Sequence, residues 1–339
     1  MLVKTNIMIV YQNKNTKRTF LIYKKVKNNI ITKNMMKYIL ALLCLTIYSC
    51  GENKINTENQ NKTDSVNLNK NTSVTENPEN KVFTADKNLR KTKFTLNDFY
   101  SENPELNKKV EEIFNSMKDD ERIAQMIITS TGNNGRPVEH VMNLIRRKRV
   151  GGVVFLGGSK EKFKSLINDF TKINEGLPLI YSTDAEPSLI NMKISGVKHF
   201  EPTGAMNSSG ECKNAAKEIS EILQDIGFNQ NYAPVCDNNS NRDVIGERSF
   251  GASEKKITEY SKIFIDETQN RNIIATAKHF PGHGMAKGDS HKSLVYIDGE
   301  LKELDVYKEL IKNKEVISIM VGHIAIRNNK EGYDTDYPA

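Results

Sequence analysis

Three histidines and an aspartate lie close together in the stretch IIATAKHFPGHGMAKGDSH, which runs from Ile273 to His291. Its first four residues are apolar or small, as expected of a short buried strand. Two glycines and a proline surround His283, so we expect this histidine on a loop of constrained shape. Asp289 and His291 are two residues apart on a loop and can meet, with the carboxylate accepting the proton of one imidazole nitrogen. Such a contact leaves the other nitrogen free for general acid/base chemistry.

Two other interpretations of these histidines stay open at the level of residue type. Imidazole is a common zinc ligand, so His279, His283 and His291 are candidate metal ligands. No helical i, i+4 pairing and no cysteine partner supports that geometry, and we expect no metal. The stretch is also compatible with a structural loop whose histidines are incidental.

The order KHFPGHG followed by DSH resembles the signature of glycoside hydrolase family 3, in its β-N-acetylhexosaminidase branch. The resemblance implies that Lys278 and His279 hold the hydroxyl groups of a sugar. It also implies that His291, oriented by Asp289, is the general acid/base. A histidine side chain titrates near neutral pH, so it can give and then take a proton with little tuning. The resemblance implies no metal or organic cofactor.

Two more segments carry the same resemblance, which covers about residues 105 to 339. The segment IGERSFG is similar to the family's IGxRSFG motif and implies that Arg248 binds substrate, since its planar donor fork suits sugar oxygens and a carboxylate neighbour. Asp184 begins a segment similar to D-x-E-G-G-R, in which the aspartate accepts hydrogen bonds from the terminal sugar. In this chain Pro187-Ser188-Leu189 replaces Gly-Gly-Arg.

Short apolar runs alternate with amphipathic helical patterns over six units, which implies a parallel sheet covered by helices. The expected strands are Met126–Ile128, Gly152–Leu156, Leu179–Tyr181, Asn231–Ala233, Ile273–Ala275 and Val316–Met320. Polar residues follow the last four of these strands, namely Asp184, Asp237, Lys278-His279 and His323. Polar groups at the carboxyl ends of several strands favour an α/β fold of the TIM (β/α)₈-barrel type over an open sheet with one switch point. We therefore expect His323 to bind substrate too.

The resemblance also implies a nucleophile, an aspartate on the seventh strand in a Ser-Asp-Asp motif downstream of a Pro-Ala pair. The sequence ends at Tyr337-Pro338-Ala339, where that segment is expected to begin. Asp334 and Asp336 lie on the preceding loop and do not fit the role. We therefore expect a barrel that lacks its last strands, and a polypeptide of residues 1–339 that does not hydrolyse sugars.

The first 92 residues predict three segments before the barrel at 93–339. Residues 1–34 show no organisation, and we interpret them as a misannotated upstream extension. Residues 35–50 combine Lys37, an apolar run and Ile-Tyr-Ser-Cys, an order that resembles a bacterial lipoprotein signal peptide with lipidation at Cys50. The apolar run is too short to span a bilayer comfortably. Residues 51–92 are almost free of apolar side chains and are expected to be a disordered tether.

Composition excludes other classes. The net charge of +7 is no sign of nucleic-acid binding, because much of the excess lies in the first 92 residues and no RNA-binding motif or phosphate-binding loop occurs. Outside the leader only Cys212 and Cys236 remain, so no disulfide framework is indicated.

Together these features predict a lipid-anchored protein of the bacterial cell envelope that acts on a carbohydrate. We expect a retaining glycoside hydrolase that releases terminal β-N-acetylglucosamine from peptidoglycan fragments or other glycans. A family 3 β-glucosidase and a non-catalytic sugar-binding lipoprotein are the alternatives.

Overall fold

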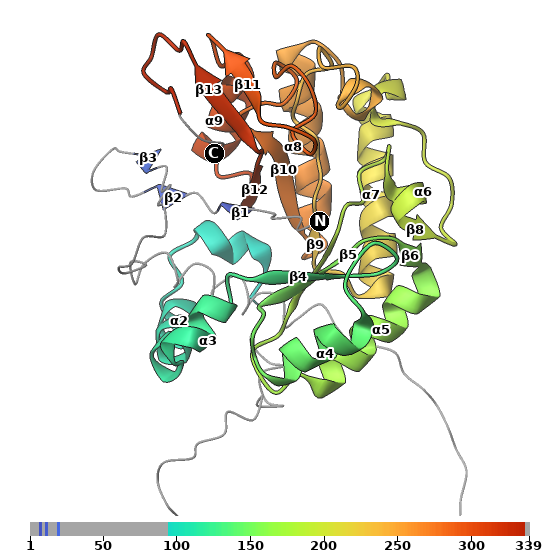
Figure 1. Cartoon of the computed structure of the whole chain (residues 1–339), viewed down its shortest axis with the longest axis vertical. Helices are drawn as coiled ribbons and strands as arrows, with labels where there is room; N and C mark the ends of the chain where they lie inside the picture. The colour runs from blue at the N-terminus through green and yellow to red at the C-terminus, as the bar shows by residue number, and fades with distance from the viewer. Residues whose placement is uncertain (1–6, 9–10, 13–18, 21–93, 336–339) are drawn as a thin grey trace, which may run out of the picture.

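Six parallel strands lie side by side in chain order at the centre of the fold (Figure 1). The structure is a computed structural model that describes residues 7–8, 11–12, 19–20 and 94–335. The strands are β4 (Ile128–Thr131), β5 (Gly152–Phe155), β7 (Ile180–Thr183), β9 (Gln230–Asn231), β10 (Ile274–Phe280) and β12 (Ser318–Val321). Each pairs in parallel with the next. The predicted alternation of six strands with helices is confirmed.

Helices connect these strands and cover the outer side of the sheet (Figure 1). They are α4 (Val138–Arg146), α5 (Lys160–Ile173), α7 (Ser209–Ile226), α8 (Glu254–Gln269) and α9 (Leu304–Lys312). Before the first strand come the 3-10 helix η2 (Leu96–Tyr100), α2 (Pro104–Ser116) and α3 (Asp119–Ala124). This α/β arrangement is the barrel type that the sequence predicts, and within the described residues the sheet stays open at β4.

Shorter elements sit in the connections. They are β6 (Gly158–Ser159), α6 (Ile190–Lys193), β8 (Ile194–Ser195), η3 (Thr203–Ala205), η4 (Gly246–Arg248), β11 (Val295–Asp298) and β13 (Ile324–Arg327). Strands β6 and β8 form one small parallel sheet, and β11 and β13 form another. Strand β1 (Ile7–Met8) pairs antiparallel with β12, and β2 (Tyr11–Gln12) pairs with β3 (Thr19–Phe20).

Helix α7 shows how the sequence specifies these elements. Apolar or small side chains recur at helical spacing and are buried against the core, including Ala216, Ile219 and Leu223. The Ser208 side chain accepts a hydrogen bond from the Glu211 backbone N–H, a cap that typically contributes about 1 kcal/mol. Gly227 ends the helix with φ of 103°, a conformation that a glycine adopts at little cost.

The core between helices and sheet contains an aromatic cluster around Phe155. Its ring meets the rings of Phe163 and Phe228 edge to face, with centroids 5.0 and 5.2 Å apart. All three side chains are buried. Each such pair typically stabilises the fold by about 1 kcal/mol beyond the contribution of the buried apolar area. The cluster fixes α5 on the sheet and thereby the strands that carry the site.

The strand boundaries differ from the predictions, most at β4 and β10. Strand β4 begins at Ile128, because the N–H groups of Met126 and Ile127 bond back to carbonyls of α3 and continue its last turn. Strand β10 runs on to Phe280, so Lys278 and His279 lie within the strand instead of after it.

The predictions for the N-terminal region concern mostly undescribed residues. The leader at 35–50 with Cys50 and the tether at 51–92 lie outside the described residues. The short strands β1 to β3 fall in the segment 1–34. Within the described part of the chain, no helix has the length and apolar character needed to cross a membrane.

Candidate active site

Lys278 on β10 holds two carboxylates at the carboxyl ends of the strands. Its ammonium nitrogen lies 2.5 Å from Oδ1 of Asp184 and 3.4 Å from Oε1 of Glu186. Both acids follow β7, so Lys278 reaches across β9 to the segment after β7. The side chains of Lys278 and Glu186 are each 1% exposed, whereas Asp184 is 24% exposed. Asp184 is therefore the member of the group that a ligand reaches first.

Arg248, on η4, closes the cluster through Glu186. Its Nε and one terminal nitrogen lie 2.9 and 2.8 Å from Oε1 of Glu186, and the other terminal nitrogen donates to the Val244 carbonyl oxygen. Burial opposes the charged form of Arg248, but the charge and hydrogen bond of Glu186 prevail and raise the arginine pKa. The cluster thus joins two cations to two carboxylates, which offsets the cost of burying charge.

Asp184 stays ionised in this cluster. Burial is the largest single influence and raises the pKa of its carboxyl. The charge and hydrogen bond of Lys278 and the charge of Arg248 together lower the pKa by more than burial raises it, so the net pKa lies below the ordinary value. An ionised carboxylate accepts hydrogen bonds only. Asp184 is therefore suited to bind hydroxyl donors such as those of a sugar.

Asp237, which follows β9, organises the histidines. Its Oδ2 lies 2.6 Å from Nδ1 of His279, and its carboxylate also accepts the backbone N–H groups of His279 and His283. Burial raises the pKa of Asp237, but the nearby His279 and these hydrogen bonds lower it below its ordinary value. Because Nδ1 of His279 faces a carboxylate, that nitrogen carries the proton and Nε2 is the one available to a ligand.

A β-bulge sets the direction of these side chains. Between β10 and β12, Lys278 pairs with Met320 and Phe280 with Val321, so His279 is an extra residue on β10. Its N–H bonds to Asp237 instead of the ladder. Bulges commonly re-aim side chains near functional sites, and here adjacent residues Lys278 and His279 meet different carboxylates at one edge of the sheet.

The predicted Asp289–His291 contact is present. Nδ1 of His291 lies 2.9 Å from Oδ1 of Asp289, which also accepts the His291 backbone N–H at 2.9 Å. That backbone bond, ahead of a smaller opposing effect of burial, lowers the pKa of Asp289. The His291 side chain is 70% exposed on the loop between β10 and β11.

The dyad is connected to the strand by its own loop. Oγ of Ser290 lies 2.9 Å from Nε2 of His283, whose side chain is buried. Burial, followed by the charge of His279, lowers the pKa of His283 and favours its neutral form. Asn241 donates to the carbonyl oxygens of Ala286 and Gly288 at 2.8 and 3.0 Å and ties the loop to the segment after β9.

The predicted site residues therefore fall into two groups and one outlying residue. Asp184, Arg248 and Lys278 form one ionic cluster, with His279 next in sequence to Lys278. The dyad lies on the neighbouring loop, and His323 lies on the turn between β12 and β13, half-buried at the same end of the sheet.

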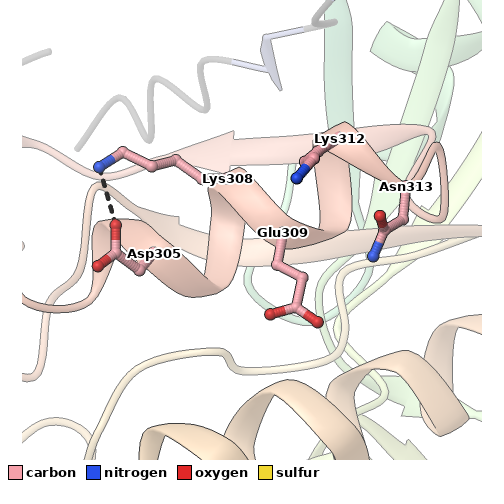
Figure 2. A pocket seen from close by; sticks show the side chains of 5 residues that line it. All are labelled: Asp305, Lys308, Glu309, Lys312 and Asn313. Atoms are coloured by element: carbon pink, nitrogen blue, oxygen red, sulfur yellow. Dashed lines mark hydrogen bonds and ion pairs between the residues drawn. The ribbon is translucent and has the colours of Figure 1, made fainter.

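A hollow of about 500 Å³ lies beside the dyad loop. It is lined by residues 240–243 of the segment after β9 and by residues 284–288 of the β10–β11 loop. Another hollow, of about 330 Å³, lies on the outer face of α9 between charged side chains such as Asp305 and Lys308 (Figure 2). The first adjoins the loop that carries Asp289 and His291.

The described residues contain no group of three or more His, Cys, Asp or Glu side chains arranged to hold a metal ion. Cys212 and Cys236 are free and buried.

Sequence reasoning missed two carboxylates of the site. Glu186 lies in the D-x-E segment and Asp237 at the end of a predicted strand, but neither received a role. The motif residues Lys278 and Arg248 were the available signal. A buried cation needs an anionic partner, so nearby carboxylates were candidates for the site.

The chain is similar to several known proteins. Residues 119–333 match the model of the glycosyl hydrolase family 3 N terminal domain. A beta-hexosaminidase of Tolumonas auensis is 27% identical over 199 residues, which cover 53% of this chain and 58% of the relative. A beta-hexosaminidase of Photobacterium profundum is 28% identical over 207 residues, which cover 58% of this chain and 60% of the relative.

A solved structure gives the same fold. The family 3 beta-N-acetylglucosaminidase of Paenibacillus sp. str. FPU-7 superposes with a TM-score of 0.59 at 25% identity and covers 66% of this chain and 44% of its own. The chain thus spans about three fifths of the length of the curated relatives it matches. The family match covers more than half of the sequence and contains the ionic cluster and the dyad, and the chain therefore belongs to glycosyl hydrolase family 3 through the N-terminal domain of that family.

Proposed function

We propose that the protein is a retaining β-N-acetylhexosaminidase that releases terminal β-N-acetylglucosamine from peptidoglycan fragments or other glycans. The observation that carries the proposal is the Asp289–His291 pair on the loop that follows Lys278 and His279. The names of the relatives support the same substrate class.

The ionic cluster supplies the sugar-binding part of the proposed site. Asp184 accepts from hydroxyl groups, and beside it Arg248 donates hydrogen bonds while Nε2 of His279 accepts them. Of the three N–H donors of Lys278, two are directed to Asp184 and Glu186, which leaves one for a sugar oxygen. Oε2 of Glu186 is buried and has no hydrogen-bond partner among the described residues.

The dyad supplies proton transfer. Asp289 holds the proton on Nδ1 of His291 and stabilises the imidazolium, whose Nε2–H gives its proton to the leaving oxygen in the first step. The imidazole is then neutral, and its Nε2 takes a proton from the attacking water in the second step. Because His291 is exposed on a loop, closure of that loop over the bound sugar brings Nε2 to the glycosidic oxygen.

The nucleophile completes the proposed reaction. We infer that it is the seventh-strand aspartate implied by the resemblance, which attacks the anomeric carbon from the face opposite His291. The test compares residues 1–339 with a chain extended through that strand, using aryl β-N-acetylglucosaminide and aryl β-glucoside. We expect turnover of the first substrate by the extended chain only. Turnover by residues 1–339 at a similar rate places the nucleophile elsewhere, and preference for the glucoside overturns the substrate assignment.

We also propose that the protein is lipid-anchored at Cys50 in the bacterial cell envelope. The proposal rests on the lipobox-like order Ile-Tyr-Ser-Cys after the apolar run. Localisation there matches peptidoglycan fragments as a substrate.

A further inference from the structure

We propose that Glu303 is a positioning residue that holds the histidine-bearing loop after β10 against the segment after β9. Glu303 immediately precedes α9 and is 4% exposed. The inference concerns the loop itself and does not depend on which sugar the protein binds.

Three backbone N–H groups from two loops converge on this carboxylate. The Asn238 N–H donates to Oε1 at 2.7 Å, and the Met285 N–H donates to Oε2 at 2.9 Å. The Gly284 N–H is the third donor. Glu303 therefore joins α9, the segment after β9 and the β10–β11 loop through one side chain.

The donors are chain neighbours of the residues that organise the histidines. Asn238 follows Asp237, and Gly284 follows His283, whose N–H Asp237 accepts at 2.7 Å. Two buried carboxylates thus fasten the same two loops at successive residues. Through its bonds to the loop, Glu303 helps to fix the position of His283. His283 in turn contacts Ser290, the residue between Asp289 and His291.

The glycines of the loop fit this arrangement. A Cβ atom at Gly282, where φ is +132°, would lie 2.4 Å from Oε2 of Glu303. A Cβ atom at Gly284 would lie 2.5 Å from Oε1 and 2.3 Å from the Asn238 carbonyl oxygen. The two glycines of the PGHG sequence therefore leave the space that the carboxylate occupies.

The protonation of Glu303 gives the proposal a measurable signature. Burial, then the charge of Asp237, raise the pKa of Glu303 to about 8, against the opposing hydrogen bonds from the loops. The other titratable groups facing it are Cys236 after β9 and Tyr307 on α9. Protonation of the carboxylate weakens one of its oxygens as a hydrogen-bond acceptor. The chemical shifts of the three N–H groups that donate to it should therefore change with pH.

The test is NMR of the full chain labelled at the carboxyl carbon of glutamate and at the amides of glycine, methionine and asparagine. In the wild-type protein we expect the amides of Asn238, Gly284 and Met285 to shift with the same pH midpoint as the Glu303 carboxyl carbon. If the chemical shifts of these amides do not change with that midpoint, the proposal is wrong. This arm stands alone if a variant fails to fold.

The matched variants are Glu303→Gln and, as control, Glu309→Gln on the exposed side of α9. Because Asn238 and Met285 donate to different oxygens, the NH₂ group of a glutamine faces one of them in either orientation. We expect the common titration to vanish and one of these amides to exchange about tenfold faster or more in Glu303→Gln. Wild-type exchange in Glu303→Gln refutes the positioning role, and neither effect is expected in Glu309→Gln. No sugar is needed, so failure here leaves the proposed function untouched.

Discussion

Replacement of Lys278 by methionine tests whether the ionic cluster is a balanced set of charges. The methionine keeps the length and apolar stem of the lysine and removes the ammonium that lies 2.5 Å from Asp184 and 3.4 Å from Glu186. Removing one partner of a buried ion pair typically costs 3–5 kcal/mol, so we expect a loss of roughly 4 kcal/mol in the free energy of unfolding at pH 7.

The loss has a defined pH dependence. In the wild-type protein the pKa of Asp184 lies below its ordinary value of 3.8, so its ionisation stabilises the fold above that pH and this contribution disappears as pH falls through the folded pKa. Without Lys278, burial opposes the ionised form with only the charges of Arg248 and Lys193 to offset it. The difference between the two proteins is therefore smallest below the folded pKa of Asp184 in the wild type and grows as pH rises through that pKa towards neutrality.

Urea unfolding followed by circular dichroism measures this difference, since the chain has no tryptophan to report by fluorescence. Lys308→Met is the matched control, because Lys308 forms an exposed pair with Asp305 at 2.8 Å (Figure 2). Such pairs contribute about 0–1 kcal/mol. A loss below about 1 kcal/mol for Lys278→Met, or one that is equal at pH 4 and pH 7, refutes the reasoning.

Three further predictions concern the other polar groups. Asp237→Asn removes one acceptor from buried N–H groups of His279 and His283 and is expected to lower the free energy of unfolding by roughly 1–3 kcal/mol, measured in urea; an unchanged midpoint contradicts it. In the extended chain, His291→Ala should slow turnover by ~10²–10⁴-fold for poor leaving groups and less in the first step for aryl glycosides; equal losses in that step argue against His291 as the acid. Cys50→Ala should abolish incorporation of labelled palmitate in a bacterial host, and equal labelling of the variant rules out lipidation at Cys50.

The elements of the fold were predictable where periodicity was strong. The apolar spacing of α7 and the apolar runs of β5 and β12 reflect burial against one sheet, a local property of the sequence. The end of β10 was not predictable, because Lys278 and His279 look like loop residues until their partners are known. Their burial depends on Asp184, Glu186 and Asp237, which are 42 to 94 residues away in sequence from the side chains that they contact.

The site shows the same division. The Asp289–His291 contact is local and was confirmed, since two residues of one loop need no other element to meet. Glu303 carried no signal, because it is one of several glutamates in a polar stretch and only its approach to the loops after β9 and β10 distinguishes it. Residue type predicts the chemistry of a side chain. Which carboxylate becomes buried depends on contacts between segments that are far apart in the sequence.

The identity of strand order and chain order has a consequence for synthesis on the ribosome. In the central sheet each of β5, β7, β9, β10 and β12 pairs with the sheet strand that precedes it in the chain, so each unit can dock as soon as it emerges. Lys278 follows Asp184 by 94 residues. At about 5–20 residues per second, roughly 5–20 s pass between the emergence of the two. During that interval Asp184 lacks its lysine partner, and the arrival of β10 completes the ionic cluster.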